Sequence, residues 1–234
     1  MANIDACESQ PDEARKINTE MPALLAELCS KFSIPLVHIS TDAVFDGKTG
    51  GYLEEDQPNP LSVYARTKLE SEKLVMVAFP RAIVLRVNFY GYSQSGNRSI
   101  AEFFLNNLLA GNTMNGFTDV IFSPLYVRDL GEIIYQMVKL ELSGLFHVVS
   151  PESISKYDFG VRIAEKFGAN PALINPIPVK QSGLRAKRSP NLNLKIDKLL
   201  KTGIIPADID SGLDEFFVDY QNGFSDRLKS LSHQ

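Results

Sequence analysis

Three segments decide the fold: IPLVHIST (34–41), VYARTKLESEKLVMVAF (63–79) and RAIVLRV (81–87). The first and third are short apolar runs rich in β-branched residues, which is typical of strands buried within a parallel sheet. Between them, a loop punctuated by prolines ends at Ser62, a preferred helix N-cap residue, and the middle segment has helical periodicity. Strand, helix and strand in this order predict an α/β protein with a parallel sheet.

The same alternation continues on both sides of this segment. Residues 11–32 have helical periodicity interrupted at Pro22, and short extended pieces are expected over residues 113–126. Further helices are predicted at 99–111, 127–142, 155–168 and near 210–230, with a strand at 144–150. Gly111 is expected to end the helix at 99–111, and Ser155 to cap the helix at 155–168.

A candidate catalytic site is formed by Thr41, Tyr64 and Lys68. Residues four apart on a helix share one face, so the Tyr64 hydroxyl and the Lys68 ammonium can face one pocket. A nearby cation favours the phenolate, so Lys68 is expected to lower the pKa of Tyr64 toward the range used in general acid catalysis. Thr41, at the end of the strand before the helix, can hold a substrate oxygen in line. The three side chains predict carbonyl/alcohol redox chemistry with a nicotinamide as hydride source.

The same spacing occurs a second time, at Tyr135 and Lys139 in DLGEIIYQMVKLEL (129–142). No strand that ends in a hydroxyl residue comes before this pair. We therefore interpret Tyr135 as an interior side chain and Lys139 as a surface one.

Composition indicates a cytoplasmic globular protein. The 234 residues are 44% hydrophobic, enough for a sizeable core, and the net charge of −4 argues against a nucleic-acid surface. MANIDACESQPDEA (1–14) has neither the basic start nor the apolar run of a secretory signal, and no window suits a membrane span. Cys7 and Cys29 do not suggest a disulfide framework, and no metal site can be assembled from three scattered histidines, of which His38 and His147 are expected in the interior.

HISTDAVFDG (38–47), YLEEDQPNPLSVYARTKLESE (52–72) and VLRVNFYG (84–91) resemble the extended short-chain dehydrogenase/reductases, and among them the dTDP-4-dehydrorhamnose reductase-like sugar-nucleotide reductases. The resemblance covers nearly the whole chain. It implies a Rossmann-like parallel sheet with a small C-terminal substrate domain, NADP(H) or NAD(H) as cofactor, and a nucleotide-sugar substrate. It also implies that Tyr64 donates the proton, that Lys68 binds the cofactor ribose and that Thr41 is the hydroxyl partner.

Further positions follow from the resemblance. Asn88 falls where relatives contact the nicotinamide or the sugar, although it is equally a turn residue, and Phe89 falls on the sugar side. Asn18 resembles a position near the site. In the basic patch of Lys180, Arg185, Lys187 and Arg188, either Arg185 or Arg188 is a candidate for binding the substrate diphosphate, and a solvated loop is the alternative.

The chain departs from this family in its glycines. A dinucleotide fingerprint needs glycines two apart, and none of the 15 glycines has another at that distance. Because family members carry on the order of 60 residues ahead of the point matching Asn3, we expect this chain to lack the first strands and the glycine-rich loop. Residues 1–88 and 124–149 would form a partial Rossmann-like core, and residues 89–123 and 150–234 the substrate-binding region. The missing strands would leave a sheet edge open to self-association, including a homodimer.

Two functions therefore remain open. One is an NAD(P)H-dependent reductase of a nucleotide-linked 4-keto-sugar, with an activity that depends on a dinucleotide-binding segment. The other is a non-catalytic regulatory or interaction protein, because the regulatory subunit of methionine adenosyltransferase is similar to the same reductases.

Overall fold

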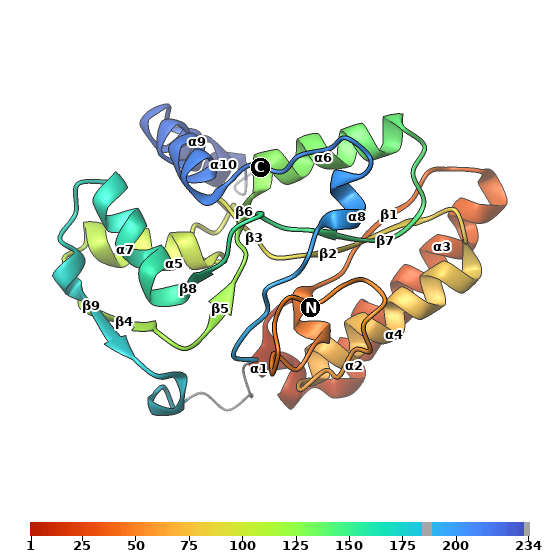
Figure 1. Ribbon diagram of the computed structural model, residues 1–234, viewed down its shortest axis with the longest axis horizontal. Helices are drawn as coiled ribbons and strands as arrows, with labels where there is room; N and C mark the ends of the chain where they lie inside the picture. Colours follow the sequence, from red (N-terminus) through yellow and green to blue (C-terminus); the bar gives the residue numbers. More distant parts are fainter. Residues whose placement is uncertain (184–188, 232–234) are drawn as a thin grey trace. The chain divides into compact units, whose positions relative to one another are not determined.

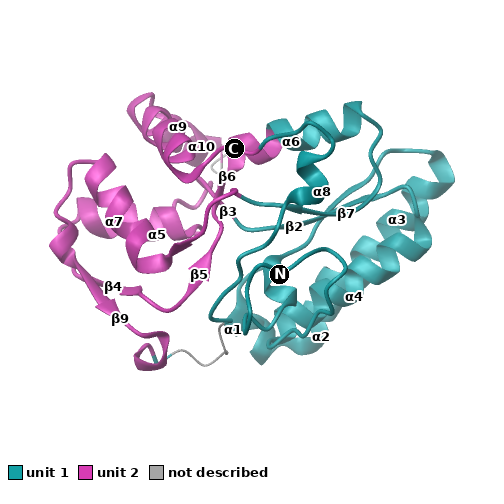
Figure 2. Cartoon of the chain, viewed as in Figure 1, with its two compact units in different colours: residues 1–88, 132–149, 183–205 teal, residues 89–131, 150–182, 206–234 magenta. Residues whose placement is uncertain are grey.

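The computed structural model describes residues 1–183 and 189–231. The chain divides into two compact units, coloured separately in Figure 2 and labelled by element in Figure 1. The first unit contains residues 1–88, 132–149 and 183–205, and the second contains residues 89–131, 150–182 and 206–234.

A parallel sheet of order β1-β2-β7 forms the centre of the first unit. Its strands are β1 (Val37–Ile39), β2 (Ile83–Val87) and β7 (Gly144–Val148). The central strand is β2, and every one of its residues is buried. The predicted α/β fold with a parallel sheet is confirmed, and the described strands are shorter than the apolar runs that predicted them.

Helix α4 (Val63–Ala78) connects β1 to β2, as the periodicity predicted. Ser62 caps it by accepting a hydrogen bond from the amide of Ala65 at 3.2 Å. Val75 of α4 packs with Ala26 and Val84 in a small buried cluster beneath the sheet. The position of α4 therefore follows from its cap and from this apolar contact.

The chain before β1 is helical: α1 (Ile4–Ser9), α2 (Pro11–Arg15), the π-helix η1 (Lys16–Glu20) and α3 (Met21–Phe32). Pro22 lies in the first turn of α3, where no backbone N–H is needed. The predicted interruption is therefore a π-helical turn that continues into α3. Helix α3 runs beside α4 (Figure 1).

In the second unit, aromatic side chains form the core. The ring of Tyr90 lies 5.1 Å from that of Phe159 and 5.7 Å from that of Phe216, centroid to centroid, and all three are buried. Strands pair two by two: β3 (Phe89–Tyr90) with β6 (Leu125–Tyr126), β4 (Met114–Phe117) with β9 (Ile174–Ile177), and β5 (Ile121–Phe122) with β8 (Ile154–Ser155). Its helices are α5 (Ile100–Leu109), α7 (Lys156–Lys166), α9 (Ile209–Gln221) and α10 (Phe224–Ser230).

Two expectations for the helices were wrong. The last predicted helix is two helices, α9 and α10, separated at Gly223, whose φ of 67° interrupts helical geometry. Tyr135 on α6 (Val127–Lys139) is 64% exposed and not interior, because α6 turns Ile133 and Met137 inward. The remaining helical segments are η2 (Asp42–Val44), η3 (Pro171–Leu173), η4 (Val179–Gln181) and α8 (Asp197–Leu200).

Candidate active site

Thr41 and Tyr64 meet at the carboxyl end of β1. Thr41 is buried and caps η2, accepting a hydrogen bond from the amide of Ala43 at 3.2 Å. Tyr64 lies in the first turn of α4, and a hydrogen bond joins its side chain to that of Thr41. The strand end and the helix start thus bring together two hydroxyl groups that are 23 positions apart in the sequence.

The phenol of Tyr64 is held protonated. Burial raises the pKa of Tyr64 from its ordinary 10 to about 12, and the negative charge of Asp42 acts in the same direction. The hydrogen bond with Thr41 lowers this pKa but does not offset the burial. At neutral pH the group is therefore a proton donor, as reduction of a carbonyl requires.

Lys68, one turn along α4, lies on the same side of the helix as Tyr64. Its Nζ donates a hydrogen bond of 2.5 Å to the carbonyl oxygen of Ile39 in β1. Burial lowers the pKa of Lys68 from 10.5 to about 8, against the opposing charge of Glu72. The expectation that the pKa of Tyr64 is lowered was wrong here, because burial dominates at the phenol and the Lys68 amine is directed at the strand carbonyl.

Asp42 is a residue of this site that sequence reasoning missed. It is 3% exposed, accepts a hydrogen bond of 3.1 Å from the Thr41 hydroxyl and one of 2.6 Å from the side-chain amide of Asn88. Asn88 thereby lies at the carboxyl end of β2, beside Thr41 at the carboxyl end of β1. The signal was present as a carboxylate directly after Thr41 in HISTDAV (38–44).

The remaining positions predicted to lie near the site are Phe89, Arg188 and Asn18. Phe89 starts the second unit and is 46% exposed, and Arg188 lies outside the described residues. Asn18, in η1, is buried and donates a hydrogen bond of 3.2 Å to the hydroxyl of Thr67, the residue before Lys68 in α4. The structure therefore brings together Thr41, Tyr64, Lys68 and Asn88, and leaves Phe89 and Arg188 without a described place among them.

A buried polar network fixes α4 against the sheet. Glu72 of α4 forms an ion pair with Arg86 of β2, with 2.8 Å between Oε2 and Nη2, and also accepts a hydrogen bond from Ser40 at 2.5 Å. Because these groups link the helix to both strands, they fix the orientation of Tyr64 and Lys68.

The two histidines of the sheet are buried, as predicted. His38 lies 3.0 Å from the Ser71 hydroxyl, and a ring nitrogen of His147 lies 3.0 Å from the carbonyl of Lys195. Burial lowers the pKa of each imidazole to about 3, so both are neutral side chains of the interior near pH 7.

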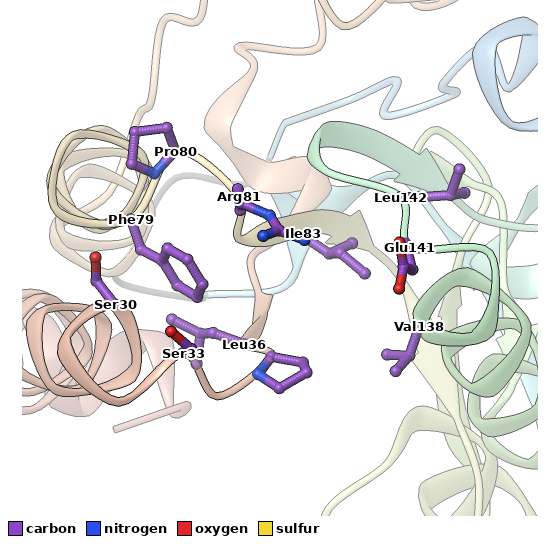
Figure 3. A pocket seen from close by; sticks show the side chains of 11 residues that line it. Ser30, Ser33, Leu36, Phe79, Pro80, Arg81, Ile83, Val138, Glu141 and Leu142 are labelled. Carbon is purple, nitrogen blue, oxygen red and sulfur yellow. The ribbon is translucent and has the colours of Figure 1, made fainter.

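A cavity of about 460 Å³ lies at the opposite end of the strands from this site (Figure 3). Leu36, which precedes β1, and Ile83, which begins β2, line it together with Val138 of α6. Thr41 and Asn88 follow the same two strands at their carboxyl ends. The cavity is therefore separate from the Tyr64 site.

Within residues 1–183 and 189–231, no three side chains of the metal-binding kind gather where they could hold an ion. Over that same part of the chain, no helix has the length and apolar character needed to cross a membrane.

The described residues fit one end of a nicotinamide dinucleotide. Tyr64, Lys68 and Asn88 offer a phenol, an amine and an amide at the carboxyl ends of adjacent parallel strands, which is where dinucleotides bind in such sheets. They do not fit the pyrophosphate, because no glycine pair with the required spacing exists in the chain. The described part of the first unit therefore offers part of a cofactor site.

Fold and site together define an α/β protein with a Tyr-x-x-x-Lys helix beside the carboxyl edge of a parallel sheet. The sequence profile of the RmlD substrate binding domain matches residues 1–222. The chain belongs to this family, which confirms the predicted resemblance to dTDP-4-dehydrorhamnose reductases.

Relatives in this family are longer than the chain. It is 36% identical over 177 residues to the probable low-salt glycan biosynthesis reductase Agl14 of Haloferax volcanii, a match that covers 74% of the chain and 59% of that relative. A dTDP-4-dehydrorhamnose reductase of Mycobacterium tuberculosis is 31% identical, in a match that covers 87% of the chain and 69% of that reductase. Methionine adenosyltransferase 2 subunit beta of Rattus norvegicus is 31% identical, in a match that covers 86% of the chain and 62% of that subunit.

A solved structure shares the fold. It is a dTDP-4-dehydrorhamnose reductase from Bacillus anthracis in complex with NADP, and it matches with a TM-score of 0.87 and 25% identity over 94% of this chain and 78% of that one. About a fifth of the solved chain, by the same figures, has no counterpart here.

Proposed function

We propose that this chain belongs to an NAD(P)H-dependent reductase of the short-chain dehydrogenase/reductase type that acts on a nucleotide-linked 4-keto-sugar. The observation that carries the proposal is the partly buried Tyr64 phenol, bonded to Thr41 beside Lys68 at the carboxyl edge of the sheet. The similarity to dTDP-4-dehydrorhamnose reductases supports the choice of substrate class.

In this reaction the chain supplies the proton. A reduced nicotinamide, when bound, supplies hydride to the carbonyl carbon. Thr41 orients the carbonyl oxygen, and Tyr64, protonated because its pKa is about 12, donates its proton to that oxygen as negative charge develops. Asp42 accepts from both Thr41 and Asn88 in this structure, and the Thr41 hydroxyl, which has a single hydrogen, turns from Asp42 to the carbonyl oxygen when the substrate is bound.

The proposed contacts for the cofactor are Tyr64, Lys68 and Asn88. The proposed contacts for the sugar nucleotide are Thr41, Asn88, Phe89 and Arg188. Residues 1–88 and 124–149 serve as the cofactor-side core in this proposal, and residues 89–123 and 150–234 as the substrate-binding region. NADP(H) is supported as one cofactor, because the Bacillus anthracis reductase structure is a complex with NADP.

The test is turnover of dTDP-4-dehydrorhamnose with NADPH, which is measured as the loss of the absorbance of the reduced nicotinamide. Because the described residues offer no phosphate cradle, the chain is assayed alone and with a second polypeptide, the part of the Mycobacterium tuberculosis reductase that lies outside its match to this chain. Turnover is expected in the second mixture. Tyr64→Phe should reduce it by about 10²- to 10⁴-fold, the usual contribution of general acid catalysis.

Tyr135→Phe is the matched control, since this residue has the same spacing to a lysine but is 64% exposed on α6. It should leave turnover unchanged. Absence of turnover in both mixtures, or equal turnover in the wild type and Tyr64→Phe, would contradict the proposal. The similarity to methionine adenosyltransferase subunit beta supports a second candidate, a regulatory binding protein, which a failed turnover assay would favour.

A further inference from the structure

The cavity of about 460 Å³ at the amino-terminal edge of the sheet has no part in the proposed reaction. Three helices end at its wall: Ser33 directly follows α3, Phe79 directly follows α4, and Glu141 lies two residues beyond α6. The carboxyl end of a helix carries a partial negative charge, so three such ends favour a positively charged group here. We call this cavity the strand-start cavity.

Much of the wall of the strand-start cavity is apolar. Leu36 and Phe79 are half-buried, and Ile83 is only 4% exposed. Val138 of α6 stands across from them (Figure 3). A volume of about 460 Å³ is in the range of sites that bind small organic molecules. The cavity therefore suits a small molecule with an apolar part.

Two side chains of opposite charge line the same cavity and do not pair with each other. Arg81, in the turn before β2, and Glu141, after α6, are both exposed. Within the described part of the chain, neither side chain forms an ion pair or a hydrogen bond. Ser30 and Ser33 add two hydroxyl groups from the end of α3 (Figure 3). A bound molecule with both charges could therefore pair with Arg81 and Glu141 at once.

The backbone is unusual at two residues of this wall. Ser33 has a φ of 55° and Glu141 a φ of 51°, and no other non-glycine residue in 1–183 or 189–231 has a positive φ. Each residue closes the helix before it, a position where glycine is usual; beyond Glu141, for example, the amide of Leu142 donates to the carbonyl of Met137 at 3.0 Å. Side chains are thus present against the preference of the backbone, a condition that is found at ligand sites.

We propose that the strand-start cavity binds a small zwitterion with an apolar side chain, of the α-amino acid class. Arg81 binds the carboxylate, because its planar guanidinium can donate two parallel hydrogen bonds to it. Glu141 binds the ammonium, which the carboxyl ends of the three helices also favour. The apolar side chain packs against Leu36, Phe79 and Ile83. A ligand with only one of the two charges leaves either Arg81 or Glu141 without its partner.

Binding of L-phenylalanine to the intact chain tests this site. Isothermal titration calorimetry measures the affinity, and methyl NMR shifts are expected at Leu36, Ile83 and Val138. N-Acetyl-L-phenylalanine lacks the ammonium and phenethylamine lacks the carboxylate. Each should bind about five- to tenfold more weakly than L-phenylalanine, because each loses one charged hydrogen-bonded contact.

Substitutions at the two charges separate their roles. Arg81→Met and Glu141→Gln should each weaken L-phenylalanine by about five- to tenfold. Glu141→Gln should bind N-acetyl-L-phenylalanine as the wild type does, because this ligand has no ammonium to lose. Glu141→Gly should also weaken L-phenylalanine, and it keeps the backbone turn because glycine adopts a positive φ freely.

The matched controls are an arginine and a glutamate that are exposed but do not line the cavity. Arg98→Met changes an arginine of the second unit, and Glu132→Gln changes a glutamate of α6. Both variants should bind L-phenylalanine as the wild type does. Absence of binding by the wild type overturns the proposal. So does equal affinity for L-phenylalanine and phenethylamine, or an affinity that neither Arg81→Met nor Glu141→Gln changes.

This site is tested independently of the proposed reaction. Tyr64→Phe should bind L-phenylalanine with unchanged affinity, because Tyr64 lies at the carboxyl end of β1 and the cavity lies where the strands begin. Loss of binding in Tyr64→Phe would place the ligand at the other end of the strands and overturn the proposal. Binding that survives in Tyr64→Phe and is weakened in Arg81→Met supports it, whether or not the chain turns over NADPH.

Discussion

Replacing Lys68 with Met should make the free energy of unfolding less dependent on pH. Burial lowers the pKa of Lys68 from 10.5 to about 8 in the folded chain. A tenfold change in proton affinity corresponds to about 1.4 kcal/mol, so keeping the charged amine in the folded state at pH 7 costs roughly 3 kcal/mol. Met has a similar length and no charge, and it removes this cost.

The sign of the pH dependence follows from the protons bound. Below about pH 8 both states hold the proton, and the cost of the buried charge is constant. Between about pH 8 and 10.5 the unfolded chain holds more protons, so the free energy of unfolding rises with pH. From about pH 7 to about pH 9 the wild type should gain roughly 1.3 kcal/mol from this residue.

Urea unfolding at a series of pH values measures this gain. Lys68→Met should be more stable than the wild type at neutral pH, and the difference should narrow toward about pH 9. Lys139→Met is the control, because Lys139 has the same spacing to a tyrosine but is exposed on α6. Parallel stability curves for the wild type and Lys68→Met over this range would refute a depressed pKa at Lys68.

Three other substitutions test the surroundings of the site and the second unit. Asp42→Asn removes a charge that raises the pKa of Tyr64, so tyrosinate absorbance should appear at lower pH than in the wild type; an unchanged titration would contradict the contact. Arg86→Met leaves Glu72 buried without its ion pair and should cost about 3–5 kcal/mol in urea unfolding, whereas changing both residues to apolar ones should recover most of it. Gly116→Ala places a methyl group 2.8 Å from a backbone carbon of α7 and should lower stability by about 1–3 kcal/mol, measured by thermal unfolding; a neutral result would show that β4 can move.

The sequence predicted the sheet and the helix that positions the site. Periodicity located α4 to within one residue at each end, and Ser62 supplied its cap. These features depend on local chemistry, that is, on side-chain period and on a hydroxyl that accepts a backbone hydrogen bond. The pairing of Thr41 with Tyr64 followed from the same topology, because a strand end and the start of the next helix meet at one edge of the sheet.

Features that depend on distant partners were not predictable in the same way. The carbonyl that Lys68 bonds belongs to Ile39, and the choice between this carbonyl and the Tyr64 phenol is made by tertiary packing. Burial likewise reversed the expected direction of the pKa of Tyr64. The exposure of Tyr135 was not predicted. Apolar side chains at helical spacing identify one face of a helix, but they do not show which of them pack against a neighbouring element.

The position of the Lys68 amine is fixed by one atom, the carbonyl oxygen of Ile39, which accepts its hydrogen bond at 2.5 Å. Because the amine is directed at this carbonyl, it does not lower the pKa of Tyr64, which burial and the charge of Asp42 raise. A phenol that keeps its proton at neutral pH and an amine whose pKa is lowered to about 8 therefore owe their titration to burial beside the sheet and not to each other.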